Sequence, residues 1–275
     1  MIHNYRKRWF RILRWVVLAV IMVVAIFPIY FMITTSFKYP IQTYDPTIWL
    51  FQPTLANYQS LFRNYAVTPR LLNSVIVTTG SVLLALVLGA LCAYGFAKFD
   101  FHNKENFAGW MLSMRFIPAM SVVIPLFLIA NSMRMLDTHI LLIVVYLTFN
   151  VPFAAWMLRG FFEEIPVELE DAAMVDGASR WQILLRVVLP LSAPGIFATA
   201  ALLVIATWNE FALALFLATN QARTMPPMTS QFQTVRGIMW GELTALGVLT
   251  TLPVLVFAIL ARKYLVRGLT FGAVK

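Results

Sequence analysis

Six long runs of apolar residues, separated by shorter polar segments, constrain this chain more than any other feature. A helix needs about 20 apolar residues to cross the hydrocarbon core of a membrane, and such runs exceed the roughly 9–11 residues of a membrane strand. Only 12% of the residues are charged, against about 25% in soluble proteins. We therefore predict an all-α, polytopic membrane protein that forms one transmembrane domain over residues 1–275, with spans at about 15–37, 71–97, 107–130, 140–158, 195–219 and 243–261.

The first run resembles a secretory signal because basic residues precede it. However, Trp15–Phe37 is uncharged for 23 residues, which is longer than the roughly 7–15 residues of a signal core. No cleavage pattern of small residues follows the run. We expect it to be a retained first span.

The basic residues predict the orientation, because cytoplasmic segments of membrane proteins carry an excess of Lys and Arg. With the N-terminus inside, 14 of them fall in inner segments and 6 in outer segments. Both termini are therefore expected in the cytoplasm of a bacterial inner membrane. Basic residues between spans also account for the net charge of +9 without a nucleic-acid partner.

The inner segment at about 160–194, between the fourth and fifth spans, holds six of the twelve acidic residues. Pro166 suits the first turn of a short helix, and Asp176-Gly177 suits its end. Ser179 can then cap a second helix that runs to Leu189, with Pro190 breaking it. Its apolar face is predicted to hold Trp181, Leu184, Leu185 and Val188.

Two helices joined by a tight turn would protrude from the cytoplasmic face and fit a groove in another protein. An amphipathic pair lying on the membrane is the alternative, but the inner leaflet is negative and favours basic helices. A DNA-binding helix-turn-helix is disfavoured because the segment is net acidic and phosphates would repel it.

The segment Glu170-Asp171-Ala172-Ala173-Met174-Val175-Asp176-Gly177-Ala178, followed by an apolar stretch ending Leu189-Pro190, resembles the EAA loop of ABC-importer permeases. Asp171 stands where the family usually has Glu, and Leu184 where it usually has an aromatic residue. The resemblance implies a type I ABC-importer permease fold with cytoplasmic coupling helices. It also implies docking on an ATPase subunit through Glu170, Asp171, Ala172, Ala173, Asp176, Gly177 and Ala178.

Further segments are similar to the carbohydrate-importer branch of these permeases, in particular the smaller subunit of the maltose and sugar-alcohol type. They are Asn73-Ser74, Ile124–Phe127, Leu136-Asp137-Thr138, Trp208–Phe211 and the end of the tail at 262–275. The resemblance implies import of a sugar, sugar alcohol or glycoside. It also implies a tail that contacts the ATPase through Gly272, Ala273, Val274 and Lys275.

The partners that the resemblance implies are a second permease subunit, a cytoplasmic ATPase dimer and a periplasmic or lipid-anchored solute-binding protein, all acting in membrane lipid. ATP and magnesium would belong to the ATPase, since this chain has no Gly-Lys dipeptide and hence no phosphate-binding Walker loop. No cofactor, metal or catalytic activity is expected of the chain itself, because its three histidines are scattered and it has one cysteine.

Two charges lie inside predicted spans, where ionisable groups are costly and often functional. Arg115 and Glu210 could pair with each other, or one could face the substrate beside Trp208 and Asn209. A structural role for Glu210 and a packing role for Trp208 are the alternatives.

Other classes of membrane protein fit the sequence less well. A secondary transporter driven by an ion gradient would need several buried acids and often carries inverted repeats. A membrane enzyme would need a cluster of His, Asp or Glu at one face, and a scaffold subunit would not need the acidic cytoplasmic segment.

Overall fold

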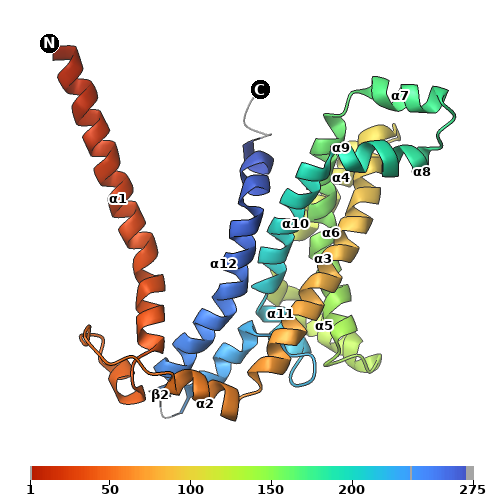
Figure 1. The fold of residues 1–275 in the computed structure, drawn as a ribbon. Coiled ribbons are helices and arrows are strands. Elements are labelled where there is room, and N and C mark those ends of the chain that lie inside the picture. The colour runs from red at the N-terminus through yellow and green to blue at the C-terminus, as the bar shows by residue number, and fades with distance from the viewer. Residues whose placement is uncertain (1, 236, 271–275) are drawn as a thin grey trace. The chain divides into compact units, whose positions relative to one another are not determined.

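The computed structural model describes residues 2–235 and 237–270, and these are almost entirely helical (Figure 1). Within that part of the chain, the strands are β1 (Gln233–Thr234) and β2 (Gly237–Ile238), which pair antiparallel. The contacts divide the chain into two units. One comprises the residues up to Ala66 with Thr229–Thr251, and the other comprises Val67–Met228 with the residues from Leu252 on.

The first unit contains α1 (Ile2–Ser36), the 3-10 helix η1 (Pro40–Tyr44), α2 (Ala56–Asn64) and the start of α12 (Trp240–Thr270). Asn57 holds the end of α1, because its fully buried amide donates to the carbonyls of Ser36 at 2.9 Å and Lys38 at 2.8 Å. The last carbonyls of a helix lack partners within the helix. Asn57 therefore replaces the water that would otherwise satisfy them.

Four helices are long and apolar enough to cross a membrane, and two bent helix pairs raise the number to six if each counts as one span. These numbers refer to the described residues. The four helices are Phe10–Ser36, Val67–Lys98, His139–Glu163 and Trp240–Lys263. They cover the first, second, fourth and sixth expected runs.

The third expected run is not one helix. It consists of α4 (Lys104–Ser113), the short 3-10 helix η2 (Met114–Phe116) and α5 (Ala119–Ser132), with a 90° bend between the two halves. The break follows from Pro118, whose ring disfavours a helical residue before it. Ile117 is accordingly extended, with ψ of 121°.

The fifth expected run also ends earlier than predicted. Helix α10 (Ala193–Trp208) stops before Asn209, and the short helix α11 (Ala212–Leu217) starts again after Phe211. The Glu210 carboxylate accepts hydrogen bonds from the backbone amides of Leu213 at 2.9 Å and Ala214 at 3.1 Å. A carboxylate in this position caps a new helix instead of continuing the old one.

Helices α3 (Val67–Lys98) and α6 (His139–Glu163) run side by side through the second unit (Figure 1). Small residues line the contact on α3 at every fourth position, and they face small residues on α6. A Cβ atom added at Gly89 would lie 2.4 Å from the Cβ of Ala154. Helices in lipid associate through such close packing, because apolar burial alone gains little there. The fully buried small residues at this contact are Ala85 and Ala93 on α3 and Ala154 and Ala155 on α6, and Gly89 is buried beside them.

A buried polar contact joins α3, α6 and α10. The side-chain amide of Asn150 on α6 donates to the hydroxyls of Ser81 on α3 and Thr207 on α10, both at 2.9 Å. All three side chains are buried. Hydrogen bonds between helices hold polar groups that have no water partner at membrane depth.

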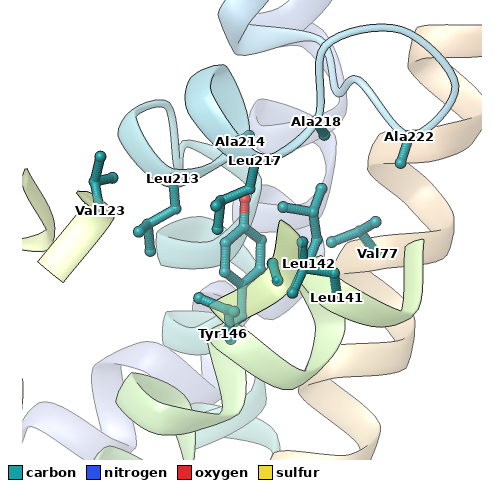
Figure 2. Packing of buried hydrophobic residues seen from close by; sticks show 12 residues of the cluster. Val77, Val123, Leu141, Leu142, Tyr146, Leu213, Ala214, Leu217, Ala218 and Ala222 are labelled. Carbon is teal, nitrogen blue, oxygen red and sulfur yellow. The ribbon is translucent and has the colours of Figure 1, made fainter. Parts of the chain in front are cut away.

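A hydrophobic cluster surrounds Tyr146 where α11 packs over α6 (Figure 2). Figure 2 shows the Tyr146 ring standing between the two helices with its hydroxyl toward α11. The other labelled members are Val77, Val123, Leu141, Leu142, Leu213, Ala214, Leu217, Ala218 and Ala222.

Candidate functional site

The acidic segment after α6 folds as a helical hairpin, which we call the coupling hairpin (residues 166–191). Its first limb is α7 (Val167–Val175), and a turn follows at Asp176 and Gly177. Gly177 has φ of +83°, the left-handed conformation that favours glycine. Ser179 begins the second limb by accepting a hydrogen bond from the amide of Gln182. The predicted pair of helices, glycine stop and serine cap are therefore confirmed.

The second limb does not break at Pro190 but ends one residue after it, at Leu191, before a 76° bend into α10. The limb continues through α8 (Arg180–Ile183), a π-helical turn η3 (Leu184–Val188) and α9 (Leu189–Leu191). Proline removes one helical hydrogen bond and its ring crowds the preceding turn. The π-turn relieves that crowding by widening the helix, and the Leu189 amide donates to the Leu184 carbonyl within it.

The hairpin has an exposed side and a packed side. Asp171, Ala172, Asp176 and Gly177 are exposed, whereas Ala173 and Ala178 are partly buried. Val175 is 88% exposed, so the exposed side also carries an apolar side chain.

The second limb packs on the ends of α3 and α6 through Ile183, Leu184 and Val188. The predicted apolar face was therefore partly wrong, because Trp181 and Leu185 are exposed. Ile183 was missed, although its spacing of four residues from Val187 follows the helical repeat.

Glu170 differs from the other acids of the segment, because it points inward and is only 2% exposed. Its Oε1 lies 2.7 Å from Nζ of Lys98, the last residue of α3. The resemblance implies the same docking role for Glu170 and Asp171, but Glu170 is buried and Asp171 is exposed.

Arg115 and Glu210 line one cavity of about 280 Å³ in the second unit. Tyr146, Asn150 and Thr207 add polar groups to its wall, and Phe149 adds an aromatic ring. The sequence did not single out these last four residues. Asn150 and Thr207 were uncharged members of apolar runs, so only the packing of three helices brings them together.

The suggested ion pair between Arg115 and Glu210 does not form. Besides the two amides of α11, the Glu210 carboxylate accepts a hydrogen bond from the Tyr146 hydroxyl at 2.8 Å. The Arg115 guanidinium instead lies 4.0 Å from the centre of the Phe153 ring, a cation–π arrangement. Glu210 is thus held by three donors, while Arg115 remains at the wall of the cavity.

Trp208 and Asn209 do not line this cavity. Trp208 is 6% exposed and faces another cavity of about 200 Å³, together with Val75 and Thr78 of α3. The Asn209 amide donates back to the carbonyl of Ile205 in its own helix. Of the four residues predicted for a substrate path, Arg115 and Glu210 therefore share a cavity, while Trp208 and Asn209 lie outside it.

The segments Asn73-Ser74 and Leu136–Thr138 meet in a network that we call the loop clamp. The Asp137 carboxylate accepts hydrogen bonds from three consecutive amides, those of Asn220 at 3.0 Å, Gln221 at 2.8 Å and Ala222 at 3.1 Å. Asn73 donates to the carbonyls of Gln221 at 2.7 Å and Arg223 at 2.9 Å. The clamp fixes the loop after α11 on the ends of α3 and α6.

The predicted tail contacts at Gly272, Ala273, Val274 and Lys275 lie outside the described residues. Among the described residues, no group of three or more His, Cys, Asp or Glu side chains is placed to hold a metal ion.

Comparison with known proteins identifies the family to which this architecture belongs. The family described as "Binding-protein-dependent transport system inner membrane component" matches residues 85–271. The trehalose/maltose transport system permease protein MalG of Thermococcus litoralis is 35% identical over 264 residues, which are 92% of each chain. The trehalose transport system permease protein SugB of Mycobacterium tuberculosis is 35% identical over 95% of this chain and 97% of its own.

The fold is similar to that of a chain in the crystal structure of a bacterial ABC transporter involved in the import of the acidic polysaccharide alginate. The TM-score is 0.78 at 21% identity, and the match covers 94% of this chain and 97% of the other. The expected class, an all-α type I permease, is confirmed, and an ion-gradient transporter is not favoured. The chain belongs to the binding-protein-dependent transport system inner membrane components and is the permease subunit of an ABC importer.

Proposed function

We propose that this permease subunit carries a sugar, sugar alcohol or glycoside. The names of similar proteins support this class, since they include trehalose/maltose and sulfoquinovosyl glycerol transport permeases. A second permease subunit completes the pathway, and a periplasmic or lipid-anchored solute-binding protein delivers the substrate. A cytoplasmic ATPase dimer binds ATP and magnesium, and this chain catalyses no reaction itself. Both of its termini lie in the cytoplasm.

The proposed mechanism rests on the coupling hairpin and its exposed side. Its exposed side combines the acid Asp171 with the apolar side chain of Val175, and this mixture suits a groove that has a basic rim and an apolar floor. The ATPase dimer closes on ATP and moves the hairpin, so that the spans change from inward-facing to outward-facing. ATP shifts this equilibrium only as far as it favours one state over the other. The tail at Gly272–Lys275 adds a second contact with the ATPase.

The cavity lined by Arg115 is the segment of the pathway that this subunit provides. Sugars present many hydroxyl groups, and ligand sites combine apolar walls with a few polar groups that orient the ligand. Arg115, Asn150 and Phe149 supply a charge, an amide and a ring at this wall. Glu210 frames the cavity by holding α11 and Tyr146 rather than by meeting the substrate.

The docking proposal is tested with Asp171→Lys and Val175→Glu in the complete transporter, and Glu164→Lys is the matched control. Glu164 is also exposed, but it lies before the coupling hairpin. We expect the two hairpin variants to lose co-purification with the ATPase and stimulated ATP hydrolysis, and the control to keep both. Unchanged co-purification of both hairpin variants would refute docking at this surface.

The cavity is tested by substrate uptake in proteoliposomes with Arg115→Gln, and Asn209→Ala is the control outside the cavity. We expect Arg115→Gln to raise the substrate concentration needed for half-maximal uptake, while ATPase co-purification stays unchanged. Trehalose and maltose serve as the first probes, supplied with the cognate solute-binding protein. Uptake that is the same in Arg115→Gln and the unmodified transporter would remove Arg115 from the path.

A further inference from the structure

The buried contact between Lys98 and Glu170 connects the coupling hairpin to the longest helix of the second unit. The ammonium Nζ lies 2.7 Å from Oε1 of Glu170, and the two side chains are 10% and 2% exposed. The same Nζ donates to the carbonyl of Ile165 at 3.1 Å. One ammonium group therefore ties together the end of α3, the segment after α6 and the first limb of the hairpin.

Apolar side chains close off this ion pair from water. Tyr94 of α3, Phe162 of α6 and Ile183 of the hairpin belong to the hydrophobic cluster at this end of the unit. The Tyr94 ring packs edge-on against Phe99, with 5.8 Å between the ring centres. Separating the two charges would leave the Lys98 ammonium with the neutral Ile165 carbonyl and Glu170 without the Lys98 charge, which is unfavourable in such surroundings. The pair is therefore expected to stay closed when the hairpin moves.

Successive residues of an α-helix point about 100° apart, so one helix can serve two surfaces. On α7, Glu170 faces the membrane domain, while Asp171 is exposed on the docking side. A push on the docking side therefore reaches Lys98 through a helix of nine residues. Lys98 ends α3, which packs along α6 and α10 and helps to fix the wall of the cavity through Ser81 and Asn150.

We propose that the Lys98–Glu170 ion pair is the joint through which the coupling hairpin drives α3, and that it remains closed throughout the transport cycle. The proposal rests on the docking of the ATPase on this hairpin. Lys98 and Glu170 are positioning residues, because neither of them touches substrate or nucleotide. The ion pair converts movement of the hairpin into movement of the spans, and ATP hydrolysis without it becomes less productive.

The first test measures substrate molecules transported per ATP hydrolysed in proteoliposomes. Lys98→Met and Glu170→Gln each break the pair, and we expect the ratio to fall by roughly 2- to 30-fold while the ATPase still co-purifies. The exchanged pair, Lys98→Glu with Glu170→Lys, is expected to recover much of the loss. Asp100→Asn is the control, because the Asp100 side chain is fully exposed where it pairs with Lys104 at 3.2 Å.

A residue with only a structural role would lower transport and ATP hydrolysis together and leave their ratio unchanged. That result in the variants would overturn the proposal. Failure of the ATPase to co-purify with the unmodified permease would instead overturn the docking on which the proposal rests. The two failures are thus distinguishable in one set of preparations.

The second test replaces the ion pair with a covalent link. In a Cys92→Ser background, Lys98→Cys and Glu170→Cys are joined by a short, flexible bifunctional thiol reagent. We expect the crosslinked transporter to take up more substrate per ATP than the same double variant without the crosslink. Uptake that is abolished by the crosslink would show that the two positions must separate during the cycle and would refute the proposal.

Discussion

The loop clamp allows a local prediction that depends on a single carboxylate, that of Asp137. Asp137 accepts hydrogen bonds from the amides of Asn220, Gln221 and Ala222 over 2.8–3.1 Å, and its own amide donates to the Leu217 carbonyl at 2.9 Å. It also adopts φ of +61°, a left-handed conformation. Asp137→Ala removes all three side-chain bonds and places alanine in a conformation that it disfavours.

The size of the effect follows from the environment of each amide. A hydrogen bond to a charged group contributes about 1.5–3 kcal/mol, but the amides of Asn220 and Gln221 lie at exposed residues where water can replace the carboxylate. Ala222 is fully buried, so its amide has no such substitute. Together with a left-handed alanine at about 1–2 kcal/mol, loop opening should become about 3–5 kcal/mol easier.

Hydrogen–deuterium exchange of residues 218–225 measures this opening directly. An effect of about 3 kcal/mol corresponds to roughly 100-fold faster exchange at the clamped amides. Asp137→Asn should fall between Asp137→Ala and the unmodified protein, because asparagine tolerates the left-handed conformation and keeps one acceptor oxygen. Asp45→Ala is the control, since that carboxylate bonds only Thr47 in an exposed turn. Unchanged exchange at 218–225 in Asp137→Ala would refute the reasoning.

Three further substitutions test packing, backbone conformation and the frame of the cavity. Gly89→Ala should destabilise the detergent-solubilised protein by about 1–3 kcal/mol, because the new methyl group would lie 2.4 Å from the Cβ of Ala154 on α6. Gly95→Ala is the control, because its methyl group meets no atom within 4 Å and should leave the stability unchanged. Equal melting temperatures of the two variants would contradict this prediction. Gly177→Ala should weaken ATPase co-purification, since φ of +83° costs alanine about 1–2 kcal/mol; full retention would show that the turn adapts. Tyr146→Phe should lower thermal stability by about 1.5–3 kcal/mol through loss of the 2.8 Å bond to Glu210, and an unchanged melting curve would argue against that bond.

The positions of the spans could be predicted because membrane thickness sets the length of an apolar run. The break in the third run was also encoded locally, since Ile117 precedes Pro118 and such residues avoid the helical conformation. Arg115 is the charged residue of that run, but Pro118, which directly follows Ile117, determines the backbone conformation there. Pro118 alone predicts two helices in this run.

The coupling hairpin shows where local signals are sufficient and where they are not. Gly177 and Ser179 act on their own neighbours, so their roles are readable from a few residues. Glu170 and Asp171 are adjacent and chemically alike, and only the distant Lys98 distinguishes them. A contact between residues so far apart in the chain leaves no local trace in the sequence.

The two intramembrane charges were predicted as candidates, but their partners were not. Opposite charges in lipid suggest a pair, because each one lowers the cost of burying the other. The chain satisfies Glu210 differently, with the Tyr146 hydroxyl and the first amides of α11. Those amides became available only because α10 ends at Trp208, a break that no proline or glycine marks in the sequence.

The amide of Asn150 restricts how this permease can move. Its two N–H groups are committed to hydroxyls on two different helices, Ser81 on α3 and Thr207 on α10, each at 2.9 Å. Sliding either helix by one turn would displace its hydroxyl by about 5.4 Å, beyond the reach of a hydrogen bond. The hydrogen bonds of Asn150 therefore oppose a screw-like or piston-like shift among the three helices and favour their tilting together as one block.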